Sequence, residues 1–180
     1  GEEINVTSSV VWGALEKGDI SVTGTYGGQS VTVTGITVSA SAAFVEVTSS
    51  SQLHDGLNFI IATSDATKVA GAFSAASSTK GKYTQEIVEE NNGMITPTTA
   101  TCIFTLRGEE GAWALETADG YVKFTGASNQ NMAVDNTSYE NLTNDHKFSV
   151  SPSGIVCNGQ SSRGIRYNKD ISGFSNYGSG

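Results

Sequence analysis

The feature that most constrains the fold of this chain is an internal repeat of fixed spacing. The segment FTLRGEEGAWALETADGYVKF begins at Phe104, and FSVSPSGIVCNGQSSRGIRYN begins at Phe148, a gap-free shift of 44 residues (148 − 104). The same shift aligns Leu106 with Val150, Trp113 with Cys157, Gly120 with Gly164, and Tyr121 with Ile165. A weaker third copy, FVEVTSS, covers residues 44–50 and precedes LNFIIAT at 57–63. Units of this length cannot bury an apolar face alone, so the copies must pack on one another.

Alternation of apolar and polar residues predicts that the chain is all-β. In residues 19–40, Ile20 and Val22 alternate with hydroxyl residues up to Gly27-Gly28, and a second arm follows, which predicts a β-hairpin. Residues 83–96 contain good helix formers, but NNG at 91–93 is a strong hairpin signal, so we predict strands there as well.

Three units of about 44 residues predict a β-trefoil-like barrel over residues 43–180. The alternative is an antiparallel β-sandwich or barrel without threefold symmetry. Counting from Phe44, the domain would open on the last strand of a unit. We therefore predict that residues 44–48 pair with residues 171–177 near the chain end.

Charge and composition limit the classes of partner. The formal net charge is −8, which repels nucleic-acid backbones and anionic membrane surfaces. No apolar run is long enough for membrane insertion. Low charged content (16%) with 21 Gly and abundant Ser, Thr and Asn is typical of hairpin-rich secreted or surface proteins. We therefore expect an extracytoplasmic location.

Nothing in the sequence indicates catalysis, a cofactor or a metal. Cys102 and Cys157 lack the spacing of a zinc site, so we interpret them as buried small residues, with a disulfide as the alternative. His54 and His146 lie near turns without a nucleophile motif, and we expect both to be solvated. We predict that the protein is not an enzyme.

The stretch SSRGIRYNKD, residues 161–170, is the best candidate for a binding site. If Ile165 faces inward, Arg166 faces outward and Tyr167 faces inward, with its hydroxyl bonded at the rim. Polar groups beside an aromatic ring suit carbohydrate binding. The candidate ligand-binding residues are Arg163, Arg166, Tyr167, Asn168 and Tyr177, with a weaker copy formed by Asp119, Tyr121 and Asn129. The alternative is that these side chains close the end of a barrel.

Several stretches carry a resemblance to known modules. FVEVTSSSQLHDGLNFIIAT, FTLRGEEGAWALETADGYVKF, SRGIRYN and GFSNY resemble uncharacterised β-modules of secreted, multi-modular proteins from gut bacteria. ISVTGTYGGQSVTVTGITVS resembles the latter half of a bacterial immunoglobulin-like module, so residues 1–42 are expected to be a small Ig-like β segment. The resemblance implies an accessory domain without an established catalytic role.

These observations predict a non-catalytic extracellular binding module, most plausibly for carbohydrate. The alternative is a structural or protein-interaction module that spaces or displays another domain. A glycan or a surface protein is the partner that we expect. The absence of a Q-x-W lectin repeat counts against the first prediction, and the immunoglobulin-like start favours the second.

Overall fold

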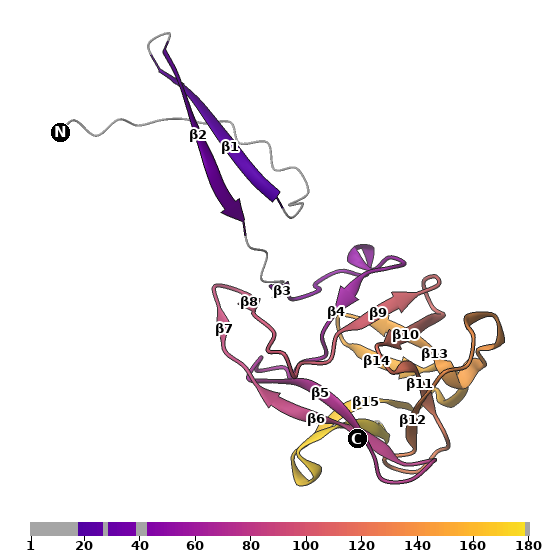
Figure 1. The fold of residues 1–180 in the computed structure, drawn as a ribbon. Coiled ribbons are helices and arrows are strands. Elements are labelled where there is room, and N and C mark those ends of the chain that lie inside the picture. The colour runs from indigo at the N-terminus through magenta and orange to yellow at the C-terminus, as the bar shows by residue number, and fades with distance from the viewer. Residues whose placement is uncertain (1–17, 27–28, 39–42, 179–180) are drawn as a thin grey trace. The chain divides into compact units, whose positions relative to one another are not determined.

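The computed structural model of the chain describes residues 18–26, 29–38 and 43–178 (Figure 1). The chain divides into two units, Gly1–Ala42 and Ala43–Gly180. In the described residues the regular elements are antiparallel β-strands, and the helical segments are short 3-10 turns. The all-β prediction is therefore confirmed. None of the described helical turns has the length and apolar character that a membrane crossing requires.

The first unit contains a hairpin of β1 (Gly18–Tyr26) and β2 (Gln29–Val38). Tyr26 pairs with Gln29, which confirms the predicted hairpin, although its turn residues 27–28 lie outside the described residues. Ile20 pairs with Ile36 but Val22 pairs with Val33, so β2 carries one extra residue, a β-bulge at Thr34-Gly35. The immunoglobulin-like character of residues 1–42 stays a prediction.

The second unit is built from short strands joined by tight turns. These strands are β3 (Phe44–Val45), β4 (Asn58–Phe59), β5 (Lys68–Ala75), β6 (Gly81–Ile87), β7 (Glu90–Asn91), β8 (Met94–Ile95), β9 (Phe104–Arg107), β10 (Trp113–Thr117), β11 (Gly120–Phe124), β12 (Met132–Asp135), β13 (Lys147–Ser151), β14 (Gly154–Cys157), β15 (Arg163–Asn168) and β16 (Gly173–Gly178). The 3-10 turns are η1 (Ser50–Gln52), η2 (Tyr139–Asn141), η3 (Asn144–His146), η4 (Asn158–Gln160) and η5 (Lys169–Ile171).

Most of these strands belong to one eleven-stranded sheet. Its order is β12-β11-β10-β13-β14-β15-β16-β6-β5, and β9 joins β4 to β10 beside this path. No sheet of the described residues closes into a barrel, so the predicted trefoil barrel is not confirmed. The antiparallel architecture is also consistent with the alternative, a β-sandwich.

The predicted NNG hairpin is confirmed, and its second strand, β8, is the strand with which β3 pairs. Asn92 and Gly93 have positive φ angles of 55° and 77°. Positive φ at both central residues is typical of the two-residue hairpin turn that fits the right-handed twist of the flanking strands. The exposed edge of β8 then pairs with β3, Phe44 opposite Ile95. The predicted pairing of residues 44–48 with residues 171–177 is therefore wrong. It fails because both edges of β16 are already occupied, by β15 and by β6.

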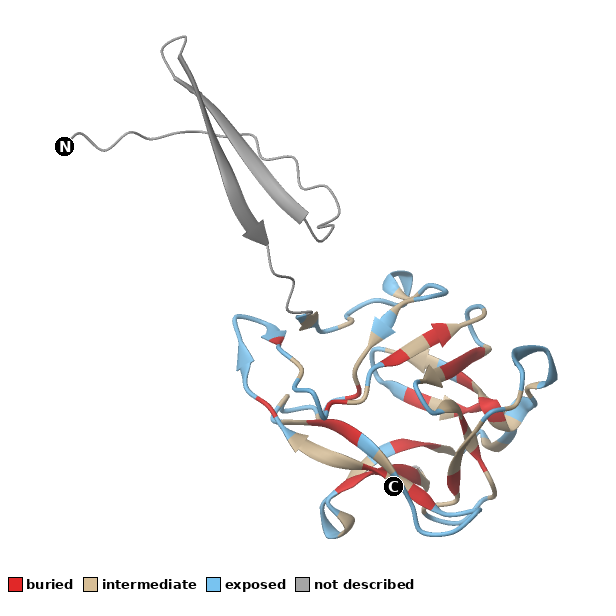
Figure 2. Ribbon diagram, viewed as in Figure 1, coloured by how far each residue is buried: buried red, intermediate tan, exposed pale blue. Residues whose placement is uncertain are grey.

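The core of the second unit is aromatic, and Figure 2 shows its buried segments in red, most of them on strands. Its largest fully buried side chains include Tyr83, Phe104, Phe124, Phe148 and Phe174. Tyr83 meets Phe104 edge to face with ring centroids 5.0 Å apart, and Phe124 meets Phe148 at 5.4 Å. Edge-to-face pairs add specificity to burial, so these rings fix how the strands pack.

The repeat is visible in the structure at some of its positions and not at others. Phe104 and Phe148 are both fully buried. The second strands do not align, because Trp113 begins β10 whereas Cys157 ends β14. The turn after β13 is shorter than the one after β9, and η4 restores the length afterwards. The third copy is also displaced, since Phe59 rather than Phe44 packs against the core, with its ring 5.5 Å from Phe104.

Candidate functional site

Strand β15 presents its side chains as the alternation predicted. Ile165 is buried, Arg166 is exposed and Tyr167 is half-buried. The Tyr167 hydroxyl donates a hydrogen bond to Gln85 Oε1 at 2.7 Å. The Tyr167 ring lies 5.3 Å from the ring of Phe174, its cross-strand partner. Tyr167 is thus held in place, with one edge at the surface.

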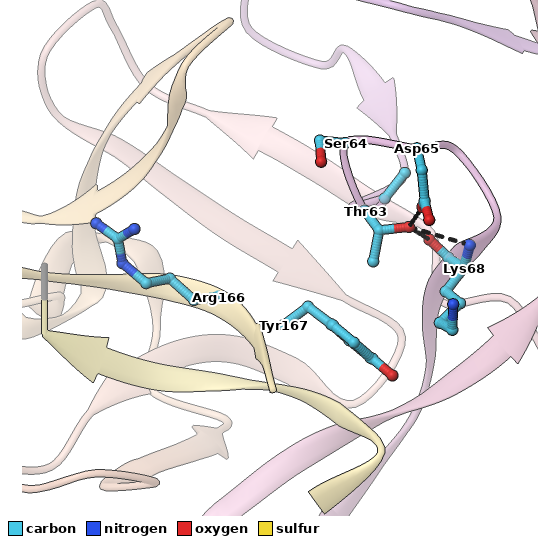
Figure 3. A pocket seen from close by; sticks show the side chains of 7 residues that line it. Thr63, Ser64, Asp65, Lys68, Arg166 and Tyr167 are labelled. Carbon is cyan, nitrogen blue, oxygen red and sulfur yellow. Dashed lines mark hydrogen bonds between the residues drawn. The ribbon is translucent and has the colours of Figure 1, made fainter. Parts of the chain in front are cut away.

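An open pocket of about 450 Å³ lies where β15 faces the loop between β4 and β5 (Figure 3). We call it the Arg166 pocket; its lining residues are Ala62, Thr63, Ser64, Asp65, Lys68, Arg166 and Tyr167. Arg166 and Tyr167 extend from β15 in different directions, and the Thr63–Lys68 loop forms the opposite side (Figure 3). The pocket therefore combines two segments about a hundred residues apart in sequence.

The loop that forms one side of this pocket is internally bonded. The Thr63 N–H donates to the Lys68 carbonyl at 2.9 Å. The Asp65 carboxylate accepts hydrogen bonds from the Thr63 hydroxyl at 2.5 Å and from the Thr67 hydroxyl at 2.8 Å. These bonds, the one from Thr63 first, lower the pKa of Asp65 to about 2. Asp65 is consequently a fixed anion, whose carboxylate oxygens can accept further hydrogen bonds in the pocket.

Two cations border the same pocket. The Lys68 ammonium lies 5.7 Å from the centroid of the Tyr167 ring and donates to the Thr67 hydroxyl at 3.1 Å. The side chain of Arg166 makes no hydrogen bond or ion pair with any residue of the described part of the chain, although its backbone pairs with Ser175 in the sheet. Its guanidinium can therefore bind a ligand without first breaking an internal contact. The Tyr167 ring, in contrast, already has Lys68 over it, and it serves as a wall more than as an open stacking platform.

Arg163 and Asn129 come together in the structure, but as part of an internal network. Arg163 Nε donates to Asn176 Oδ1 at 2.6 Å, and its Nη2 donates to Asn129 Oδ1 at 2.7 Å. Asn176 is fully buried and donates through Nδ2 to the Gly126 carbonyl at 3.0 Å and to the Asn131 carbonyl at 2.9 Å. This network joins β15 and β16 to the loop before β12. For Arg163 and Asn129, structural closure is the role that the contacts support.

The other predicted residues lie apart from the Arg166 pocket. Asn168 accepts a hydrogen bond from the Asp170 N–H at 2.8 Å and so caps η5. Tyr177 on β16 pairs with Gly164 on β15, and the Tyr177 hydroxyl is buried without a hydrogen-bond partner among the described residues. Asp119 is exposed in the turn between β10 and β11. Tyr121 lines a different pocket. The predicted patch is thus divided among several places.

The two histidines differ from each other. His54 is exposed, as predicted, but the prediction of a solvated His146 is wrong because only 1% of its surface is exposed. His146 Nδ1 accepts a hydrogen bond from the Thr143 N–H at 3.2 Å, and Nε2 lies 3.2 Å from Asp135 Oδ2. These contacts fix the turn η3 against β12. They also help to hold the pKa of Asp135 below its usual range, against burial and together with hydrogen bonds from Thr137.

Both cysteines are free thiols, so the disulfide alternative is not what the structure contains. Cys157 is buried and Cys102 is half-buried. Burial raises the pKa of Cys102 to about 12 and also raises that of Cys157. Because the thiolate is the reactive form, both thiols should be inert in the folded protein.

We expect iodoacetamide at about pH 8 to alkylate both cysteines at least about a hundredfold more slowly in the folded chain than in the unfolded chain, where thiols have ordinary pKa values. Mass spectrometry of intact protein, with and without guanidinium chloride, measures both rates. A chain that stays unlabelled after unfolding without reductant, and is two hydrogens lighter than its sequence requires, would instead contain a disulfide.

The loop residues of the Arg166 pocket were not predicted from the sequence, although the polar stretch TSDATK between two strands is a turn signal. The sequence does not show which strand this turn faces. No protein-family model matches the chain, and no curated protein or solved structure is significantly similar to it.

Proposed function

We propose that this chain is a non-catalytic, extracellular binding module that takes a carbohydrate in the Arg166 pocket. One observation carries the proposal. The Arg166 side chain has no hydrogen-bond or ion-pair partner in the described part of the chain, and Arg166 lines a pocket whose opposite side presents Thr63, Ser64 and Asp65.

Saccharides suit this set of groups. Sugar hydroxyls both donate and accept hydrogen bonds, and here Arg166 and Lys68 donate while Asp65 accepts. Charge-assisted hydrogen bonds of this kind are stronger than neutral ones. The bonds within the Thr63–Lys68 loop reduce the ordering cost of binding, because the loop is already held in one conformation. Tyr167 adds an apolar wall for the C–H groups of a sugar ring.

A trefoil is the finer description that we propose for the second unit, and contacts between its first strands support it. An isolated bridge between Ala62 and Val69, and a hydrogen bond from the Ala70 N–H to the Ile61 carbonyl at 2.9 Å, join β5 to the segment that continues β4. β4 in turn pairs with β9. With the repeat of 44 residues, these contacts favour a ring of strands built from three related units. Trefoils often carry lectin sites, although a fold alone is a weak guide to function.

The location and the non-catalytic role rest on the sequence. The composition favours a secreted or surface protein, and the resemblance to accessory modules of secreted bacterial proteins favours a role in binding. The pKa of Asp65 supports the same role, because a carboxyl with a pKa of about 2 is a poor general base near neutral pH.

A protein-interaction module is the second candidate, and exposed apolar side chains favour it. Val45 and Met94 pair across β3 and β8 with 62% and 42% of their surfaces exposed, and Ile87 at the end of β6 is 75% exposed. Exposed apolar groups that gather on one surface are typical of contacts with other proteins.

The full chain should bind at least one glycan class on a broad glycan array. Arg166→Ala should weaken this binding by at least about tenfold, the usual cost of losing a charge-assisted hydrogen bond. Lys169→Ala is the matched control, because it removes another exposed positive charge, on η5 and outside the pocket, and it should change affinity by less than about twofold. Equal losses in the two variants would contradict the site, and an array without binding would favour the protein-interaction role.

A further inference from the structure

A second open pocket, of about 600 Å³, shares no residue with the Arg166 pocket. Its lining residues are Asp55, Arg107, Gly108, Glu116, Tyr121 and Tyr139, and we call it the Tyr139 pocket. Only Tyr121 was among the residues that the sequence analysis selected. The pocket combines three adjacent strands with the turn after η1 and with η2.

Strand register brings the polar residues of this pocket onto one face. Glu116 on β10 pairs directly with Tyr121 on β11. Arg107 on β9 pairs with Ala114, so it lies diagonally across from Glu116 on the same face of the sheet. Leu106 and Leu115, on the other face, are fully buried. Burial of the leucines therefore fixes the outward direction of the polar set.

These polar groups are held by one another. Arg107 Nε donates to Glu116 Oε2 at 2.6 Å, and the Tyr121 hydroxyl donates to Glu116 Oε1 at 3.4 Å. Asp55 Oδ1 accepts a hydrogen bond from the Gly108 N–H at 2.9 Å. Burial, and after it the Glu116 charge, raises the pKa of Tyr121, so its hydroxyl stays protonated and keeps its bond to Glu116.

Tyr139 adds an exposed aromatic surface to this polar set. Its ring centroid lies 6.3 Å from that of Tyr121, with 52° between the ring planes, so the two rings form an open corner. The Lys147 ammonium lies 4.2 Å from the Tyr139 ring centroid, and 43% of the Tyr139 surface is exposed. A Cβ at residue 108 would lie 2.7 Å from the Tyr139 hydroxyl, and Gly108 has a φ of 109°, so the corner depends on glycine there.

We propose that the Tyr139 pocket binds an uncharged pyranose residue, as a second saccharide site. Arg107 and Lys147 balance the charges of Glu116 and Asp55, so the pocket has no net charge with which to hold an ionic ligand. The hydroxyls of a neutral sugar can donate to Glu116, to Asp55 and to the Tyr121 oxygen, and they can accept from the N–H groups of Arg107 that Glu116 leaves free. The C–H face of the sugar ring packs on the exposed part of the Tyr139 side chain, whose ring Lys147 holds in place. Because the two pockets share no residue, a negative result for ligand binding at one pocket does not contradict the proposal for the other.

Amide chemical shifts of the isotopically labelled full chain test this proposal. The probes are the methyl glycosides of glucose, galactose, mannose and N-acetylglucosamine, with the charged sugar glucuronate as a comparison. At least one methyl glycoside should shift the amides of Gly108, Glu116 and Tyr121 saturably, with a dissociation constant of about 1 mM, and glucuronate should not. Tyr139→Ala should weaken the binding at least about fivefold, whereas Arg166→Ala should leave it unchanged.

Glu116→Gln is a second variant that keeps the shape of the side chain while removing its charge, and it should weaken the same binding. Spectra of both variants should match the parent spectrum away from the pocket, which shows that each still folds. The proposal is overturned if none of the four glycosides shifts these amides, if both folded variants bind as tightly as the parent chain, or if glucuronate binds at the same residues.

Discussion

Gly164→Ala is expected to lower the free energy of unfolding by at least about 3 kcal/mol, the upper range for forced overpacking. A Cβ at residue 164 would lie 2.3 Å from the Ile155 carbonyl oxygen of the neighbouring strand β14. A backbone oxygen cannot rotate away as a side chain can, so the strands must separate. β14 and β15 pair through Val156 and Gly164, and the methyl group would therefore disturb the point at which the two strands meet.

Gly178→Ala is the matched control for this prediction. It lies on the adjacent strand β16, and a Cβ there would be 3.5 Å from the Arg163 guanidinium, an ordinary contact. Denaturant unfolding should place this variant within about 1 kcal/mol of the parent chain. Similar losses in both variants, or no loss at Gly164, would contradict the close approach of β14 and β15.

Asn176→Ala is expected to cost about 3 kcal/mol of unfolding free energy, because each unsatisfied buried polar group costs about 1–3 kcal/mol. The fully buried Asn176 side chain donates to two backbone carbonyls and accepts from Arg163. Alanine leaves all three partners without this bond and also leaves a cavity. Denaturant unfolding followed by circular dichroism measures the loss.

Asn129→Ala removes the other side chain that Arg163 contacts, and it is the control for Asn176. Asn129 is exposed and water can replace its single bond to Arg163, so we expect a loss below about 1 kcal/mol. Equal effects of the two substitutions would mean that the network is not organised around Asn176. The expected contrast also separates the two arginines of SSRGIRYNKD, because Arg163 holds the fold together and Arg166 has no internal partner among the described residues.

The sequence predicted the features that depend only on residues close together along the chain. Alternation was sufficient to place Ile165 inward and Arg166 outward, and the NNG signal was sufficient for the hairpin of β7 and β8. The two glycines that the repeat aligns, Gly120 and Gly164, each lie against the backbone of a neighbouring strand. A Cβ at residue 120 would be 2.2 Å from the Asp135 carbonyl oxygen, and one at residue 164 would be 2.3 Å from the Ile155 carbonyl oxygen.

Long-range pairing could not be predicted in the same way. Which strand covers residues 44–48 depends on which edges remain open, and β8 offers an edge whereas β16 does not. The Thr63–Lys68 loop was recognisable as a turn, but not as the neighbour of β15. His146 was misplaced for a similar reason, because its contact with Asp135 joins the turn η3 to β12, and the sequence does not show that these two segments meet. The contact between Arg107 and Glu116 could not be predicted without the register of β9 and β10, which the turn between these strands sets.

The experiment that decides whether the Arg166 pocket is a carbohydrate site is an amide-shift map of the full chain with the best-bound glycan from the array. We predict that the largest shifts fall on residues 62–68 and 166–168, and that Arg166→Ala abolishes them. Shifts confined to the Tyr139 pocket or to the exposed strands β3 and β8, or no shifts with any array glycan, would contradict the proposed function of the Arg166 pocket.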